Sequence, residues 1–157
     1  MSDAIRPRGV FVTGTDTGVG KTLVSACLVR AWDAAYWKPL QTGFADEPGD
    51  TASVATLAEL TPDRCHAPAH ALAAPLAPHA AALLEGVSIR LDELVLPAET
   101  RSLVVEGAGG LMVPINDRAL MIDLIAQLGL PAVLVARSRG CPGRCCKSEV
   151  GAAPLSR

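Results

Sequence analysis

Apolar residues in this chain form short runs that end near glycine, proline or a charged residue, and stretches with helical spacing separate these runs. The runs predict buried strands over residues 9–14, 101–106 and 132–137, with a further extended piece over residues 35–43. The intervening stretches predict helices over residues 21–35, 49–60, 78–86, 89–97 and 121–129. Strands that alternate with helices predict an α/β fold, in which a parallel sheet carries helices on both faces.

Two stretches show neither the apolar runs of a strand nor the spacing of a helix. Residues 61–78 are rich in Ala, Pro and His, and we expect them to run over the surface as loop. Residues 139–157 contain three cysteines and four basic residues, and we expect an unstructured tail there. The chain is therefore divided into one domain over residues 1–138 and an atypical tail over residues 139–157.

The segment "VTGTDTGVGKT" resembles a phosphate-binding loop with an unusual spacing. Five residues separate Gly14 from Gly20-Lys21-Thr22, whereas the common pattern G-x-x-x-x-G-K-S/T has four. The loop nevertheless lies between a predicted strand and a predicted helix, and it combines permissive glycines, a lysine and a hydroxyl. This context predicts a site for the phosphates of a nucleotide.

Further polar residues follow the other predicted strands, so they should gather at the same edge of the sheet. Mg²⁺ bound beside a triphosphate needs oxygen ligands, and Thr22, Asp50 and Glu106 could supply them. The alternative for Asp50 is capping of the helix over residues 49–60, by Asp50 or its neighbour Thr51. The "KPLQTG" turn would direct Lys38 towards this cleft, although a lysine at a strand end is usually a surface residue.

Composition limits the classes of function. With 157 residues, 50% of them apolar and 19% charged, the chain can bury one sizeable core. The net charge of -2 gives no electrostatic support for binding to nucleic acid or to an anionic membrane. No apolar run reaches the roughly 18 residues of a membrane span, and the first residues lack the apolar core of a signal peptide, so a cytoplasmic protein is expected.

The cysteines and histidines give little support for a disulfide framework or a zinc site. The five cysteines are scattered or crowded in the tail, which favours free thiols. Cys65 is followed by His66 and His70, with His79 further on, but this spacing lacks the second pair that a zinc site needs.

Four segments together resemble the dethiobiotin synthetase family in order and approximate spacing: "FVTGTDTGVGKT", "WKPLQTG", "PLAPHAAA" and "VVEGAGGLMVPI". The family's phosphate loop has the same longer spacing, and the resemblance extends from Gly9 to about Ser138. It implies an ATP- and Mg²⁺-dependent enzyme of biotin biosynthesis that works as a cytoplasmic homodimer. Its reaction would convert 7,8-diaminononanoate and CO₂ into dethiobiotin through a phosphorylated carbamate.

Carried over by motif, the resemblance implies a role for each residue. Lys21 and Lys38 would be catalytic, and Thr17 and Thr42 would contact the substrate. Mg²⁺ would be held by Thr22, Asp50 and Glu106. The nucleotide would be bound by Gly18, Val19, Gly20, Lys21, Thr22, Leu23, Asp50, Glu106, Gly107, Ala108 and Gly109.

The chain departs from the family in three respects. Gly18 stands where some relatives carry an acidic residue, and the segment from Lys21 to Lys38 is shorter than usual. Beyond Ser138, where the family supplies interface, substrate and adenine-binding elements, the tail has the composition expected of a reading-frame shift. The strand over residues 132–137 would then have an open edge. The alternatives are a non-catalytic nucleotide-binding remnant and a P-loop ATPase switch, although such switches usually have a second lysine early in the loop.

Overall fold

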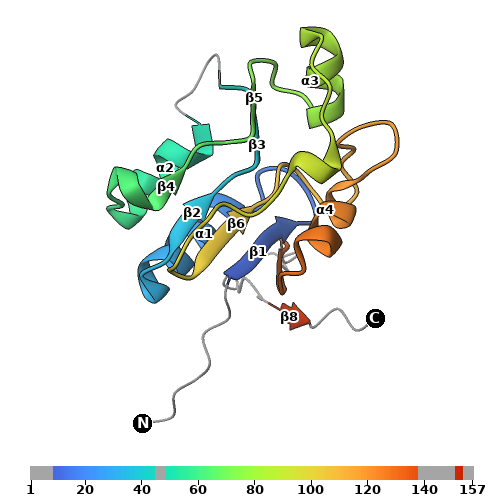
Figure 1. The fold of residues 1–157 in the computed structure, drawn as a ribbon. Coiled ribbons are helices and arrows are strands. Elements are labelled where there is room, and N and C mark those ends of the chain that lie inside the picture. Colours follow the sequence, from blue (N-terminus) through green and yellow to red (C-terminus); the bar gives the residue numbers. More distant parts are fainter. Residues whose placement is uncertain (1–8, 45–48, 138–150, 154–157) are drawn as a thin grey trace, which may run out of the picture.

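The computed structural model describes residues 9–44 and 49–137, together with the backbone of residues 151–153 (Figure 1). Its main sheet has the strand order β4-β2-β6-β1-β7-β8, and the first five strands are parallel. The strands of this sheet are β1 (Gly9–Gly14), β2 (Ala35–Trp37), β4 (Cys65–His66), β6 (Leu103–Glu106), β7 (Ala132–Val135) and β8 (Gly151–Ala153). The predicted parallel α/β sheet is confirmed.

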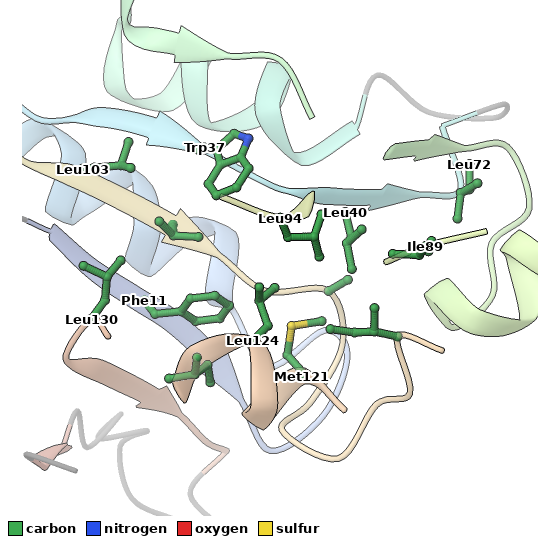
Figure 2. Packing of buried hydrophobic residues seen from close by; sticks show 14 of the residues in the cluster. Phe11, Trp37, Leu40, Leu72, Ile89, Leu94, Leu103, Met121, Leu124 and Leu130 are labelled. Atoms are coloured by element: carbon green, nitrogen blue, oxygen red, sulfur yellow. The ribbon is translucent and has the colours of Figure 1, made fainter. Parts of the chain in front are cut away.

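Helices cover both faces of the sheet, as the sequence predicts. Helices α1 (Lys21–Trp32) and α2 (Gly49–Ala58) lie on one face and α4 (Met121–Leu128) on the other, whereas α3 (Pro78–Glu85) packs against the short strands Leu40–Thr42 and His70–Leu72. Strand β1 shows how the core is divided: Val10 and Val12 pack in the cluster that holds α1 and α2, whereas Phe11 points to the opposite face. Figure 2 shows Phe11 beside Leu124 and Met121 of α4. The alternation along β1 therefore gives each face its own apolar cluster.

The prediction of a surface loop over residues 61–78 is wrong. This stretch contains a 3₁₀ turn (Pro62–Arg64), strand β4 and strand β5 (His70–Leu72), and Leu72 is buried. Strand β5 pairs in parallel with β3 (Leu40–Thr42), forming a separate two-stranded sheet. Strands of two or three residues are too short to show a period, so their distant partners determine them.

Residues 89–97 also differ from expectation, because only Leu91–Glu93 form a turn, of the 3₁₀ type. The side chain of Gln127 in α4 donates hydrogen bonds to the carbonyl oxygens of Leu91 and Leu94, over 2.7 and 3.1 Å. Leu94 is fully buried in the cluster beneath. Backbone groups that find partners on another helix do not require a helix of their own.

The predicted cap of α2 is wrong as well. The helix begins at Gly49, so Asp50 and Thr51 lie inside its first turn. The backbone N–H of Asp50 instead donates to Oε1 of Gln41, over 3.2 Å. Because Gln41 supplies this acceptor, the Asp50 carboxylate is available for other contacts.

The tail departs from expectation in one place. Strand β8 pairs antiparallel with β7 opposite Ala132, Val133 and Leu134, so the expectations of an unstructured tail and of an open strand edge are wrong for these residues. Pairing satisfies the backbone groups that an edge strand would expose. The rest of the tail, 139–150 and 154–157, and Ser138 lie outside the described residues.

Cys27 and Cys65 are free thiols, as the sequence predicts, and the other three cysteines lie outside the described residues. Across the described ranges, no helix is both long and apolar enough to cross a membrane.

Candidate functional site

The loops that follow β1, β3 and β6 meet around one pocket of about 1010 Å³. Of the residues that the sequence predicts for the site, Val19 and Gly107 do not line this pocket. The predicted residues that do line it are Thr17, Gly18, Gly20, Lys21, Thr22, Leu23, Lys38, Thr42, Asp50, Glu106, Ala108 and Gly109. The parallel sheet thus brings together segments that lie up to 92 positions apart in the chain, from Thr17 to Gly109.

The glycine-rich loop leads directly into the N-terminus of α1. Gly20 has φ 101°, a left-handed conformation that favours glycine, and Lys21 is the first residue of the helix. The Lys21 side chain is buried, and its Nζ donates to the backbone oxygen of Asp16 over 2.8 Å. A helix N-terminus that presents free N–H groups beside a lysine is suited to an anion such as phosphate.

The loop is also held from two sides. The backbone N–H of Leu111 donates to the carbonyl of Gly14 over 3.1 Å, and Nη2 of Arg137 donates to the carbonyl of Gly18 over 2.9 Å. A Cβ at Gly110 would lie 2.9 Å from the carbonyl oxygen of Thr15. The turn after β6 therefore packs against the phosphate loop at a distance that only glycine allows.

An ion cluster of charged side chains lines the pocket, with Lys38 and Glu106 buried and Asp50 partly exposed. Lys38 Nζ lies 2.6 Å from Asp50 Oδ2 and 3.4 Å from Glu106 Oε1. Thr22 Oγ1 lies 3.1 Å from Asp50 Oδ1 and also 3.1 Å from Glu106 Oε1. The lysine is therefore no surface residue: one ammonium group and one hydroxyl link two carboxylates from different elements.

Two polar residues that hydrogen-bond to the ion cluster were missed by the sequence analysis. The hydroxyl of Tyr36 donates to Glu106 Oε2 over 3.1 Å, and both residues are buried. Gln41 donates from Nε2 to the carbonyl of Thr42 over 2.8 Å and accepts the Asp50 N–H. The available signal for both residues was a polar side chain within three positions of Lys38 in the sequence.

The electrostatic environment changes the pKa of three of these groups. Burial lowers the pKa of Lys21, and the nearby charge of Lys38 lowers it further. Burial alone would raise the pKa of Asp50, but the charge and hydrogen bond of Lys38, with the hydroxyl of Thr22, outweigh it and the pKa falls. Burial, followed by the charge of Glu106, raises the pKa of Tyr36 well above its ordinary value. At neutral pH Tyr36 is therefore a hydrogen-bond donor.

The three predicted metal ligands are in contact, because the Thr22 hydroxyl lies 3.1 Å from a carboxylate oxygen of Asp50 and 3.1 Å from one of Glu106. In the parts of the chain that are described, no group of three or more His, Cys, Asp or Glu side chains is arranged to hold a metal. The predicted set instead combines the Asp50 and Glu106 carboxylates with the Thr22 hydroxyl. These are hard oxygen donors, and two carboxylates with further places for phosphate and water suit Mg²⁺.

Strand, glycine-rich loop, lysine and helix N-terminus within a parallel sheet define a nucleotide-binding protein of the P-loop class. The chain matches the sequence profile of a family described as "AAA domain" over residues 8–141. Three curated relatives refine this assignment.

The "Biotin biosynthesis bifunctional protein BioCD" of Bordetella avium is 69% identical over 133 residues, which are 85% of this chain and 29% of that protein. The "ATP-dependent dethiobiotin synthetase BioD" of Paramagnetospirillum magneticum is 61% identical, over 83% of this chain and 62% of the relative. The synthetase of the same name from Brucella ovis is 50% identical, over 82% and 60%.

The chain therefore belongs to the AAA-domain family. Over most of its length its sequence is similar to proteins named dethiobiotin synthetases. It spans about three fifths of the length of the separate synthetases that it matches.

Proposed function

We propose that this chain binds ATP and Mg²⁺ and forms dethiobiotin from 7,8-diaminononanoate and CO₂. The observation that carries the proposal is the ion cluster of Lys38, Asp50 and Glu106 beside the phosphate loop. The names of the relatives supply the reaction, because these proteins are called ATP-dependent dethiobiotin synthetases.

In this reaction an amine of the substrate adds to CO₂ and becomes a carbamate, and ATP phosphorylates the carbamate and leaves as ADP. The second amine then attacks the carbamate carbon, loses a proton and displaces phosphate, which closes the ring. Phosphoryl transfer depends mainly on positioning and on neutralising charge, so cations in a dry pocket are the main requirement. Lys21 would bind the ATP phosphates, and Lys38 would stabilise the carbamate and the group transferred to it. Both lysines are buried, which strengthens their attraction to anions.

The other residues would bind and orient the two substrates. Thr17 and Thr42 both line the pocket and would contact the diamine. The turn from Glu106 to Gly109 would lie beside the nucleotide. Thr22, Asp50 and Glu106 would hold Mg²⁺, which when bound neutralises phosphate charge.

A nucleotide-dependent switch or a non-catalytic nucleotide-binding protein would use the same loop. Neither of these gives a role to Lys38 and Thr42, which share the pocket with the phosphate loop. The loop also has no lysine before Lys21, whereas a switch of this fold usually has one there. The pocket therefore favours a ligase over a switch.

The test incubates the full 157-residue chain with ATP, MgCl₂, bicarbonate and 7,8-diaminononanoate, and measures dethiobiotin by mass spectrometry. We expect product from the wild type and none from Lys38→Met. The matched control is Arg30→Met, which removes an exposed cation paired with Glu59 at the surface and should leave turnover unchanged.

The same proteins are then compared by thermal unfolding with MgATP, before and after the diamine is added. The proposal predicts that the diamine raises the unfolding temperature further. A protein that responds to MgATP alone and forms no dethiobiotin would be a nucleotide-binding protein without the ligase function.

A further inference from the structure

The hydrogen bond between Tyr36 and Glu106 joins the core of the protein to the pocket. The Tyr36 hydroxyl donates to Glu106 Oε2 over 3.1 Å, and the tyrosine does not line the pocket itself. We propose that Tyr36 is a positioning residue, which fixes the Glu106 carboxylate so that one of its oxygens faces the metal. This inference rests on the proposed function.

The two oxygens of Glu106 have different surroundings. Oε2 accepts the hydrogen bond of Tyr36, whereas Oε1 lies 3.1 Å from Thr22 Oγ1 and 3.4 Å from Lys38 Nζ. One oxygen is therefore bound from the core side, and the other faces the groups that surround the phosphate loop. Such a carboxylate can offer Oε1 to a cation without losing the hydrogen bond on Oε2.

The position of Tyr36 in the sheet leaves its side chain little freedom. Strands β2 and β6 are neighbours, and Tyr36 is in register with Val104, two residues before Glu106. The tyrosine is fully buried in the cluster that includes Val29 and Val54 of the covering helices. Because interiors are closely packed, the ring cannot rotate away, and its hydroxyl stays at a fixed place beside Glu106.

Loss of the hydroxyl would free the carboxylate. In Tyr36→Phe the ring remains, but Oε2 loses its donor, and Glu106 can rotate until both oxygens approach the ammonium of Lys38. Residues that orient metal ligands from the second layer typically contribute about 10- to 100-fold to metal affinity. We therefore expect Tyr36→Phe to lower the affinity for Mg²⁺ by about that factor in the presence of ATP.

The experiment distinguishes an effect on Mg²⁺ binding from an effect on the binding of ATP itself. The affinity of the full chain for ATP is measured by calorimetry at several MgCl₂ concentrations and again in EDTA. Tyr36→Phe should need about 10- to 100-fold more Mg²⁺ for the same gain in ATP affinity, and its affinity in EDTA should equal that of the wild type. The control Val29→Ala removes part of the same apolar cluster, so it should lower stability and leave both affinities unchanged.

Three results would contradict either the positioning role of Tyr36 or the metal site on which it depends. If Tyr36→Phe has the Mg²⁺ dependence of the wild type, the inference is wrong and the proposed function stands. If Val29→Ala loses Mg²⁺ affinity as much as Tyr36→Phe, the effect comes from stability alone and the inference is also wrong. If ATP binding by the wild type does not depend on Mg²⁺, the metal site of the proposed function is wrong, and the inference about Tyr36 is wrong with it.

A second measurement does not depend on the variant being folded. Tyr36 is the single tyrosine of the chain, so growth on 3-fluorotyrosine places one fluorine label beside Glu106. Its NMR resonance should shift when Mg²⁺ is added to the ATP complex and should return when EDTA removes the metal. If the chemical shift of this resonance does not change with Mg²⁺ although calorimetry detects metal binding, the inference is wrong.

Discussion

Replacing Lys38 by methionine removes the cation that lies between two carboxylates, and a long apolar side chain remains in its place. Lys38 is 4% exposed and Glu106 is 1% exposed, so the substitution leaves a buried carboxyl group without the ammonium group that lies beside it. Asp50 is 38% exposed, and water can hydrate its carboxylate once the lysine is gone. The effect on stability should therefore come mainly from Glu106.

The size of the stability loss in Lys38→Met follows from the difference in exposure between Glu106 and Asp50. Removing one partner of a buried ion pair typically costs about 3–5 kcal/mol, whereas an exposed pair contributes about 0–1 kcal/mol. Glu106 keeps the hydrogen bonds of Tyr36 and Thr22, which places the loss at the lower end of this range. We expect Lys38→Met to lower the free energy of unfolding by about 3 kcal/mol.

Urea unfolding, followed by tryptophan fluorescence, measures this change as a shift of the midpoint by about 1–3 M. The double variant Lys38→Met with Glu106→Gln removes both charges and should recover part of the loss. The surface control Arg30→Met should unfold close to the wild-type midpoint. The reasoning is refuted if Lys38→Met unfolds with the wild type, or if the double variant is no more stable than Lys38→Met.

Three further predictions concern the loop, the carboxylate and the turn. Lys21→Ala should weaken ATP binding roughly 10- to 150-fold in calorimetry, the loss of one charge-assisted contact, and unchanged affinity would contradict the phosphate site. Because the pKa of Asp50 lies below its ordinary 3.8, its stabilisation is complete above that value and disappears as the pH falls through the lowered pKa. Asp50→Asn should thus lose less stability than the wild type in urea titrations between about pH 6 and pH 2, and parallel curves would refute this. Gly110→Ala would place its Cβ 2.9 Å from the Thr15 carbonyl oxygen and should lower the free energy of unfolding by about 1–3 kcal/mol in thermal melts; an unchanged melting temperature would contradict this close packing.

Local patterns determined much of this protein. The run over residues 9–14 and the glycine-rich loop form as predicted, and the helix after them begins at Lys21 as predicted but ends at Trp32, before residue 35. Each depends on neighbouring residues: an apolar period, permissive glycines and helical spacing. Glycine and proline also marked the end of α4 correctly, with Gly129 in the left-handed conformation of a C-cap. The succession of such elements was enough to predict the parallel sheet and the edge at which polar residues gather.

Only the tertiary structure decided the features that depend on distant partners. Strands β3 and β5 have three residues each and exist through pairing with one another across about 30 positions of sequence. The burial of Lys38, which the sequence left open, results from two carboxylates that other elements bring to it. Tyr36 and Gln41 acquire their roles in the same way, because a hydrogen bond to a residue far away in the chain does not appear in the pattern of apolar and polar residues. The sequence therefore determined the elements and their order, and the packed sheet determined which polar groups meet, because that depends on contacts formed only when the chain is folded.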